Sequence, residues 1–578
     1  MGILLKQLRV HGFRGLNNLE VDFEPTTVLV GTNNAGKTTI LKALQIALSN
    51  SLQITDDDFF FSDEVTLNKI IIDVLFISVD ENGNQNNVFE DKWATGVFKD
   101  DRISFDRTGN QIAAFRTVIE ENLIRKTFTK KQFVIDEWSD FRDTQGEFWY
   151  EKKFEKQLGF YFDEIPFFYL DANRDILEDL KSKTSFLGKL LSSINYDQDD
   201  RKHIEQLIEE LNKTTIAKSD VLRNLHATLE ELDTAMDNPN STVDITPFTK
   251  KLRDLNKGVK INYSQFSMEY HGMGTRSWSS LLILKAFILQ NMDLAEGGKV
   301  AYYPIIAIEE PESHLHPNAQ KKLYSQINNI VGQKIVSTHS SYIAGSARLG
   351  EVRSICRAGN NPYIGKFIEK EFSDEDIRKI CRQVVNTRGE LFFSKLVILF
   401  EGETEEQALP ITIEKYFNKS SIELGVDFVG VGGFGNYLPF IKFFDAFNVS
   451  YLIFSDNEAE TNVSVNSQIS KSKANDTNKV VFLSDGNDFE KELCVTGYID
   501  EVKSAYYQLV LSDCKNERHR DAKKLELDKL LDTEYYELIT KLKTQFAPLI
   551  GYELYKSEKP LPAKLLELFE KTELILKA

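Results

Sequence analysis

The sequence predicts an α/β protein with more than one domain, and three observations lead to this prediction. A glycine-rich loop at residues 31–38 follows a short apolar run and precedes a helical pattern. Two later apolar runs, at 302–308 and 395–400, each end in acidic residues. Apolar strands that lead into glycine loops or acidic tips are typical of parallel sheets, whose ligands bind at the carboxyl ends of the strands.

Length and composition agree with several soluble domains. The chain has 578 residues, which at roughly 150 residues per domain corresponds to more than two domains. Hydrophobic residues make up 42% and charged residues 27%, an ordinary soluble composition that can form large cores. The chain has four cysteines, Cys356, Cys381, Cys494 and Cys514. None belongs to a C-x-x-C pair, so the sequence indicates neither a disulfide framework nor a zinc site.

Targeting signals and net charge narrow the functional classes. The first residues show no signal-peptide pattern, and no apolar run approaches the roughly 20 residues of a membrane-spanning helix. We therefore expect a cytoplasmic protein without a membrane partner. The formal net charge of −18 argues against a non-specific nucleic-acid coat, which is normally basic. A metal-dependent DNA enzyme stays open, because it needs clustered carboxylates and can keep a local basic groove.

The first glycine loop has the spacing G-x-x-x-x-G-K-T of a phosphate-binding loop. The strand pattern at 27–30 and the helical pattern at 40–44 supply the expected context. The glycines let backbone N–H groups surround phosphate oxygens, Lys37 reaches the outer phosphates, and the Thr38 hydroxyl ligands Mg²⁺. The predicted nucleotide-binding residues of the loop are Gly31, Asn33, Asn34, Gly36, Lys37, Thr38 and Thr39.

The chain changes character after its strand-rich first 110 residues. Within 175–260, the segments 204–211 and 221–232 have apolar residues at i, i+3 and i+4 and charged outer faces. This pattern predicts two or more amphipathic helices. They either pack on their own domain or form an inserted dimerisation arm, and the pattern favours neither.

Acidic residues follow the apolar run 302–308, at Glu309, Glu310 and Glu312. One such acid can hold Mg²⁺, and its neighbour can polarise the attacking water. A second run at 334–336 leads into a polar tip that contains His339. Each piece alone is common, but their order after a phosphate loop predicts a nucleotide-hydrolysing site.

A second pattern of strands with acidic tips begins after residue 390. Glu401 follows the run 395–400, and Asp456 and Glu458 follow the run 451–455. Carboxylates at neighbouring strand tips can hold one or two divalent cations, and oxygen ligands suit Mg²⁺ or Mn²⁺. Two such ions can activate water and stabilise the leaving oxygen in phosphodiester cleavage. Acids that merely face solvent are the alternative.

The N-terminal motifs together resemble ABC-type ATPases of the SMC/RecF/OLD group. The matching motifs are Phe13-Arg14-Gly15, the phosphate loop, Glu309-Glu310-Pro311-Glu312 with Leu315-His316-Pro317, and Ser337-Thr338-His339-Ser340. The resemblance implies a head that binds ATP between two head-to-tail copies. It places Glu309 at the metal position, Glu310 at the catalytic glutamate and His339 at the switch histidine.

The same resemblance implies a signature loop that reaches the ATP of the partner copy. The best match is Gly272–Ser277 ahead of a helix, with Gly274 and Arg276 as its contacts. Arg276 stands where many members of the group have glutamine. The glutamine that the group carries in its helical lobe has no clear match in this sequence.

The second pattern resembles a TOPRIM domain of the OLD (overcoming lysogenization defect) family. The order Glu-Gly-x-Thr-Glu, Val-Gly-Gly and Asp-x-acid matches that family. The resemblance implies metal-binding and catalytic roles for four acids, Glu401, Glu405, Asp456 and Glu458. Glu490 is a further implied ligand. Lys543 matches a C-terminal lysine that would steady transition-state charge, with Lys541 as a near alternative.

The combined resemblance implies two domains and a function. Residues 1–385 would form the ABC-type ATPase domain, with a helical dimerisation insert at about 175–260, and residues 386–578 the TOPRIM nuclease domain with C-terminal helices. The implied function is an ATP-regulated, Mg²⁺- or Mn²⁺-dependent DNA endonuclease in antiphage defence, assembled as a homodimer or homotetramer. Relatives that act with a helicase-like protein (Gabija) or with a reverse transcriptase and its DNA (retrons) imply a partner encoded nearby, and nothing in the sequence selects one.

Two other functions stay open from sequence. One is an ATP-driven DNA-binding or clamp protein whose TOPRIM domain is only a scaffold. The other is a topoisomerase-like strand passer, which requires a tyrosine nucleophile on a separate DNA-binding domain. None of the 21 tyrosines is identified as that nucleophile.

Overall fold

The computed structural model describes most of the chain. The described residues are 2–49, 54–62, 66–80, 83–122, 127–142, 144, 146–154, 156–157, 162–182, 185–192, 197–221, 262–263, 266–270, 272–298, 301–358, 361–471, 476–512, 514 and 516–577. They form two compact units, Met1–Tyr169 with Ile305–Glu312 and Pro317–Ala578, and Leu170–Pro304 with Ser313–His316. The first unit contains residues on both sides of the expected domain boundary at 385/386, so that boundary stays a prediction.

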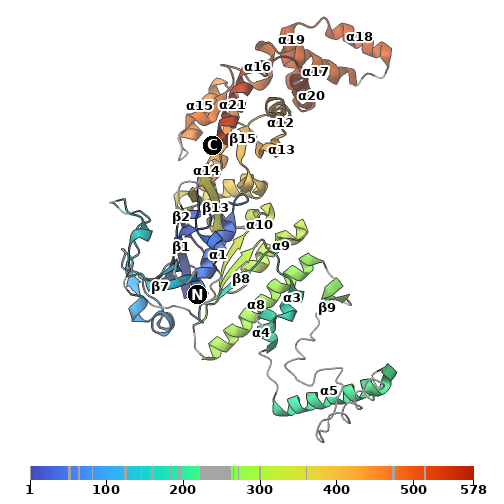
Figure 1. Cartoon of the computed structure of the whole chain (residues 1–578). Helices are drawn as coiled ribbons and strands as arrows, with labels where there is room; N and C mark the ends of the chain where they lie inside the picture. Colours follow the sequence, from blue (N-terminus) through green and yellow to red (C-terminus); the bar gives the residue numbers. More distant parts are fainter. Residues whose placement is uncertain are drawn as a thin grey trace. The chain divides into compact units, whose positions relative to one another are not determined.

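An antiparallel sheet opens the first unit, in the order β2-β1-β4-β6-β5 with β7 paired to β6. Figure 1 labels its strands β1, β2 and β7. The strands are β1 (Ile3–Phe13), β2 (Leu16–Asp22), β4 (Lys69–Ser78), β5 (Ser104–Phe105), β6 (Gln111–Asn122) and β7 (Thr127–Val134). Every residue of β4 after Lys69 is buried. The sheet therefore packs on both faces at its centre, which explains the continuous apolar run in that strand.

A second sheet of six strands carries the phosphate loop, in the order β14-β13-β3-β12-β11-β8. The strands are β3 (Thr26–Val30), β8 (Phe167–Leu170), β11 (Ile305–Glu309), β12 (Gln333–Ser337), β13 (Val352–Ala358) and β14 (Asn361–Lys366). The pairs β13–β3, β3–β12 and β12–β11 are parallel. In register, Glu309 lies opposite Ser337, and Ser337 lies opposite Leu29. The loops after these strands therefore meet at one edge of the sheet.

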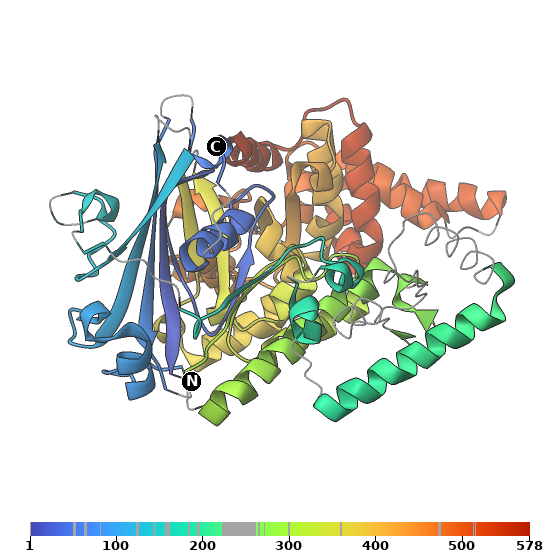
Figure 2. The ribbon, with the colours of Figure 1, turned by 60° about the horizontal axis from the view of Figure 1, so that its bottom comes forward.

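Helix α1 (Lys37–Leu48) contacts β1 and β4 on one side and β11 and β12 on the other. Figure 2 shows this helix in blue beside the long antiparallel strands. Its apolar residues Ile40, Leu41 and Leu44 are fully buried between the two sheets. Other helices of the same unit are α2 (Asp91–Trp93), α9 (Pro317–Asn328), α10 (Ser341–Ser346) and α11 (Asp374–Ile380).

The C-terminal part of the first unit contains a four-stranded parallel sheet, in the order β16-β15-β17-β18. Its strands are β15 (Leu396–Phe400), β16 (Val426–Gly430), β17 (Tyr451–Ser455) and β18 (Val480–Phe482). The helices are α12 (Glu403–Phe417), α13 (Ser421–Leu424), α14 (Tyr437–Phe447), α15 (Ala459–Ser470), α16 (Phe489–Val495), α17 (Ile499–Ser512), α18 (Glu517–Leu527), α19 (Asp532–Ile539), α20 (Lys543–Lys556) and α21 (Ala563–Lys577). One hydrophobic core joins β15 to α12, α20 and α21.

The second unit is mainly helical in its described residues. Its elements are α3 (Ile176–Lys181), α4 (Phe186–Ser192), α5 (Gln198–Lys218), α8 (Met273–Gly298) and the short strands β9 (Asn262–Tyr263) and β10 (Phe266–Ser267). The first predicted amphipathic segment, 204–211, lies within α5, where Leu207 and Leu211 are 51% and 49% exposed. The second, 221–232, falls outside the described residues after Val221.

The start of α8 changes one expectation drawn from the sequence. The segment Gly272–Ser277 was expected as a loop ahead of a helix, but α8 begins at Met273. The Arg276 N–H donates to the Gly272 carbonyl, so the predicted contact residues Gly274 and Arg276 lie in the first turn of α8. Among the described residues, no helix is long and apolar enough to span a bilayer.

Candidate nucleotide and metal sites

The phosphate loop has the backbone geometry that its glycines predict. Gly31 and Gly36 have φ angles of +148° and +117°, which residues with a side chain rarely adopt. A Cβ on Gly31 would lie 2.6 Å from the Ile355 carbonyl oxygen. The Lys37 ammonium donates to the carbonyl oxygens of Gly31 and Thr32 at 2.8 and 3.0 Å. Burial lowers the pKa of Lys37 to about 8, although three nearby glutamates oppose this shift.

A cavity of about 610 Å³ opens over this loop. Of the predicted loop residues, Asn33, Asn34, Gly36, Lys37, Thr38 and Thr39 line it. Glu310 and His339 line it as well, so the structure brings together residues from three separate sequence motifs. His339 Nε2 lies 3.8 Å from Glu310 Oε1. Burial and the charge of Lys37 lower the pKa of His339, which keeps the imidazole neutral near pH 7.

Glu309 is held at both of its carboxylate oxygens. The Thr38 hydroxyl donates to one oxygen, and the Tyr169 hydroxyl donates to the other. The Lys42 ammonium lies 3.9 Å from the centre of the Tyr169 ring. The pairing of Thr38 with Glu309 is the one expected of two ligands that share a Mg²⁺ ion. Sequence reasoning missed Tyr169, which lies 140 positions from Glu309 and belongs to no motif.

Glu312, the last acid of the Glu-Glu-Pro-Glu motif, shapes the tip that carries His339. One of its oxygens accepts from the Thr338 hydroxyl at 2.7 Å and from the backbone N–H groups of His339 and Ser340 at 2.7 and 3.0 Å. Burial raises the pKa of this carboxyl group despite these bonds. Glu312 therefore positions the turn after β12.

The predicted signature residues Gly274 and Arg276 belong to the second unit. The Arg276 guanidinium makes two hydrogen bonds to the Asp175 carboxylate, one of them 2.9 Å long. Asp175 also caps α3, because its carboxylate accepts from the Leu177 N–H. A Cβ on Gly274 would lie 2.4 Å from the His314 carbonyl oxygen, so that position requires glycine. The role of both residues toward the ATP of a partner copy stays a prediction.

The C-terminal sheet brings Glu401 and Asp456 to adjacent strand ends. Glu401 follows β15 and Asp456 follows β17, and these two strands pair in parallel. Glu401 Oε1 accepts from Ser455 Oγ at 2.5 Å and from the Tyr437 hydroxyl at 3.2 Å. Burial raises the pKa of Glu401 in spite of these two donors. Ser455 and Tyr437 are contacts that sequence reasoning missed.

The pKa values of Asp456, which is half-buried, and of Glu405, which is buried, are both raised by burial and by neighbouring carboxylates. Burial, followed by the charges of Glu405 and Glu401, raises the pKa of Asp456 to about 9. Asp456 Oδ1 is buried and has no hydrogen-bond partner among the residues that the structure describes. Burial and the charge of Glu490 raise the pKa of Glu405, which is only 4% exposed, to about 8. A bound cation would stabilise both carboxylates in their charged form.

Lys543 is the cation beside this carboxylate cluster. Its ammonium donates to Glu490 Oε2 at 2.8 Å and lies 3.9 Å from Asp488 Oδ2. Burial opposes the charged form, but the hydrogen bond and charge of Glu490 raise the pKa of Lys543. Glu490 is 1% exposed and also accepts from Thr404 Oγ1 at 2.5 Å. Lys541, the alternative lysine, is exposed and has no ion pair to these acids among the described residues.

The predicted metal-binding residues are neighbours, but they do not form one compact set of ligands. Glu458 is exposed next to α15, near enough for its charge to act on Glu401. Within the described part of the chain, no three His, Cys, Asp or Glu side chains are close enough together to form a metal-binding set. Ser455 donates to Glu401, Thr404 donates to Glu490, and Lys543 pairs with Glu490 and lies near Asp488. The partnerless Asp456 oxygen is the feature that fits a cation.

The fold and the two sites define the class of protein: an α/β nucleotide-binding head followed by a parallel-sheet domain with acids at its strand ends. The family model described as AAA ATPase domain matches residues 4–344, and the chain belongs to that family. Residues 392–457 match the model described as overcoming lysogenization defect protein-like, TOPRIM domain. The predicted fold class and the OLD-type order of ATPase and TOPRIM domains are thereby confirmed.

Curated relatives match this chain over most of their length. The Old nuclease of Escherichia phage P2 is 23% identical over 500 residues, which cover 80% of this chain and 78% of the relative. The OLD nuclease of Thermus scotoductus is 22% identical over 487 residues, covering 79% and 82%. The endonuclease GajA of Bacillus cereus is 21% identical over 517 residues, covering 74% and 72%.

Solved structures give weaker likenesses. The C-terminal region of the Burkholderia pseudomallei OLD protein is 16% identical and covers 32% of this chain and 99% of that chain, with a TM-score of 0.25. A Smc head bound to the C-terminal winged-helix domain of ScpA is 12% identical and covers 64% and 98%, with a TM-score of 0.34.

Proposed function

We propose that this chain is an ATP-regulated, divalent-metal-dependent DNA endonuclease. The main support is the buried, partnerless carboxylate oxygen of Asp456 at a strand end adjacent to Glu401. The carboxylates of a divalent-cation site repel one another and have raised pKa values when the charge of the cation is not included. Asp456 and Glu405 both have such raised pKa values. The three named nuclease relatives agree with this proposal.

Glu401, Asp456 and Glu405 would hold the metal, with Glu490 and Glu458 as the outer acids of the same set. When bound, Mg²⁺ or Mn²⁺ would supply an activated water and neutralise charge on the phosphodiester. Ser455 and Tyr437 fix the orientation of the Glu401 carboxylate through their two hydrogen bonds. Lys543 keeps its proton, since Glu490 raises its pKa, and places a positive charge beside the acids.

In the head, the cavity over the phosphate loop would bind ATP with Mg²⁺. Lys37 would contact the outer phosphates, and Thr38 and Glu309 would be the residues nearest the ion. Glu310 would orient the attacking water, and His339 lies next to it in the neutral form. We assign an antiphage role, and a helicase-like or reverse-transcriptase partner encoded nearby, on family resemblance alone, and the neighbouring genes would identify that partner.

A plasmid assay tests the nuclease proposal against its alternatives. Supercoiled plasmid is incubated with the full-length protein and Mg²⁺ or Mn²⁺, with and without ATP, and the products are separated on a gel. Nicked or linear DNA is expected. Relaxed closed circles would show a topoisomerase instead, and unchanged DNA retained on a filter would show a DNA-binding or clamp protein.

Tyr169→Phe is expected to raise the Mg²⁺ concentration needed for half-maximal ATP binding about 10-fold. The substitution keeps the ring beside Lys42 but removes the hydroxyl that holds one oxygen of Glu309. Titration of Mg²⁺ at fixed fluorescent ATP measures the effect. Tyr342→Phe, an exposed tyrosine of the same unit, is the control. An unchanged Mg²⁺ dependence in Tyr169→Phe would show that the hydroxyl does not position Glu309.

Assembly into at least a homodimer is expected without ATP, with a tetramer if both the head and the helical insert contribute surfaces. Helix α5 exposes Leu207 and Leu211 by about half, which is consistent with a surface for another copy. Deleting residues 198–218 should therefore lower the assembly state more than Lys37→Ala does. Light scattering with and without ATP measures this. A mass of 66.2 kDa for the parent under both conditions would exclude the dimer.

A further inference from the structure

Arg357 is a cation of the nucleotide cavity that no sequence motif assigned. It lies near the end of β13 and lines the cavity together with the phosphate loop. Its Nη2 donates to the Gly15 carbonyl at 3.2 Å, and its Nε donates to the Ala35 carbonyl at 3.5 Å. No carboxylate of the described residues forms an ion pair with it. The guanidinium, with five N–H donors, therefore retains donors for a ligand anion.

Gly15 leaves the space that this guanidinium occupies. A Cβ on Gly15 would lie 2.5 Å from Arg357 Nη2. The arginine of the Phe13-Arg14-Gly15 motif is committed elsewhere, since Arg14 Nε donates to Asp58 Oδ1 at 2.7 Å. Gly15 of this motif thus leaves room beside the phosphate loop for Arg357, which comes from the end of the head sequence.

The two carbonyl contacts of Arg357 are weak competitors for a phosphate. Hydrogen bonds between an ionised donor and an ionised acceptor are roughly twice as strong as those to a neutral carbonyl. The planar guanidinium also matches two phosphate oxygens at once, which a lysine cannot do. A polyphosphate in the cavity would therefore draw Arg357 away from Gly15 and Ala35.

The residue before Arg357 faces the TOPRIM domain. Successive side chains of a strand point to opposite sides, so Cys356 lies on the other face of β13. Cys356 Sγ is 3.7 Å from the Phe447 carbonyl oxygen at the end of α14. On the paired strand β14, a Cβ on Gly365 would lie 2.6 Å from the Phe447 backbone. The hairpin β13–β14 thus packs directly against the last turn of α14.

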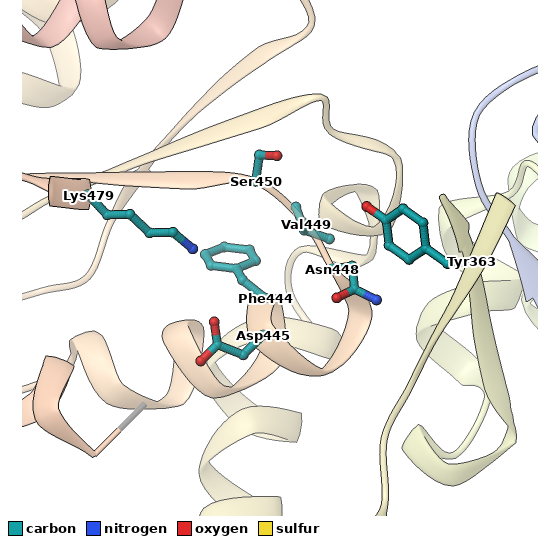
Figure 3. Close-up of a pocket in the computed structure, with 7 residues that line it drawn as sticks. All are labelled: Tyr363, Phe444, Asp445, Asn448, Val449, Ser450 and Lys479. Atoms are coloured by element: carbon teal, nitrogen blue, oxygen red, sulfur yellow. The ribbon is translucent and has the colours of Figure 1, made fainter. Parts of the chain in front are cut away.

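A cavity of about 450 Å³ borders this contact. Figure 3 shows Tyr363 of β14 beside Asn448 and Val449, which follow α14, with Phe444 and Lys479 farther along the cavity. The hairpin and the helix therefore meet along one edge, with open space next to it. A small displacement of the hairpin would therefore reach the end of α14 directly.

The other end of α14 contacts the carboxylate cluster. Tyr437, its first residue, is fully buried and donates its hydroxyl to Glu401 Oε1 at 3.2 Å. The helix has 11 residues, a length of about 16 Å. Four phenylalanines, at 440, 443, 444 and 447, are buried along it. One rigid helix therefore connects the hairpin of Arg357 with the Tyr437 that orients Glu401.

We propose that Arg357 binds the phosphates of the nucleotide and that β13–β14 and α14 relay this contact to Glu401. The inference rests on the proposed ATP site and metal site and names the residue through which one regulates the other. Phosphate binding pulls Arg357 toward the cavity, the hairpin follows, and the end of α14 shifts. Because Tyr437 holds Glu401, the carboxylate that would face the metal changes position with the nucleotide state.

Arg357→Ala and Arg357→Lys test the phosphate contact in the full-length protein. Fluorescent mant-ATP is titrated in the presence of Mg²⁺, and melting temperatures check folding. Affinity is expected to fall about 10-fold or more for alanine, since hydrogen bonds to charged groups contribute ~1.5–3 kcal/mol, and less for lysine. Arg348→Ala removes an exposed arginine just before the same strand and should match the parent. Parental mant-ATP affinity in Arg357→Ala, with binding lost in Lys37→Ala, would overturn the inference and leave the ATP site intact.

Gly365→Ala tests the relay separately, because its Cβ would displace the hairpin from α14 outside the nucleotide cavity. Plasmid nicking is measured at saturating ATP and without ATP, and each variant is compared with its own ATP-free rate. We expect Gly365→Ala to bind mant-ATP like the parent but to lose most of the ATP-dependent change in nicking rate. An undiminished ATP effect in Gly365→Ala would overturn the relay. A parent protein that binds no mant-ATP would instead contradict the proposed function itself.

Discussion

Asp456→Asn is expected to abolish plasmid nicking while ATP binding persists. The substitution keeps the shape of the side chain and removes the charge of a half-buried carboxylate whose buried Oδ1 has no partner among the described residues. Losing a metal ligand should lower the nicking rate by on the order of 100-fold or more. Glu401→Gln, on the adjacent strand end, should give a loss of the same size, since both acids would contact the same ion.

Glu406→Gln is the matched control for these two variants. Glu406 lies in the first turn of α12 beside Glu405, but it is exposed. It therefore loses the same charge without touching the carboxylate cluster, and its nicking rate should equal that of the parent. The melting temperature of Asp456→Asn in metal-free buffer should not fall, because a buried unpaired acid becomes neutral. Full cleavage by Asp456→Asn and Glu401→Gln at ordinary Mg²⁺ concentrations would refute the assignment of cleavage to the TOPRIM domain.

The contiguous motifs were the parts of the sites that sequence could predict. The residues Gly31–Thr38 occur in one loop, so spacing alone specifies their arrangement around a phosphate. Glu309 ends β11 and His339 follows the end of β12, and parallel pairing brings such strand ends to one edge of the sheet. The same reasoning placed Glu401 and Asp456 at adjacent strand ends. Their chemical roles remain predictions.

Single residues that reach a site from distant elements were not predictable. Tyr169 contacts Glu309 from 140 positions away, and Arg357 contacts Gly15 from 342 positions away. Neither has a spacing relation to a motif, because each depends on how one strand pairs inside the sheet. The choice between Lys541 and Lys543 likewise depended on where α20 begins, a boundary that helical pattern does not specify to one residue.

Lys37→Ala is expected to lower ATP affinity about 10- to 150-fold, the equivalent of ~1.5–3 kcal/mol for a hydrogen bond to a charged group. Lys37 is 6% exposed and is one of two cations, with Arg357, that line the nucleotide cavity in the described chain. Its removal also takes away the Lys37 hydrogen bonds to the Gly31 and Thr32 carbonyls, the second of which still accepts from the Ala35 N–H, so the loop loses contacts that shape it. Equilibrium titration with labelled ATP and Mg²⁺ measures the change.

Two further variants separate the loss of a phosphate contact from a general defect. Lys322→Ala removes an exposed lysine of α9 in the same unit and should bind ATP like the parent. Glu310→Gln keeps a side chain of the same size in the cavity wall but removes the carboxylate that would orient water. This variant should therefore bind ATP and hydrolyse it more slowly. Equal ATP affinity in Lys37→Ala and the parent would contradict the phosphate-loop assignment. Loss of binding in Lys37→Ala together with retention in Glu310→Gln would place the triphosphate at Lys37, because only the first variant removes a positive charge from the cavity.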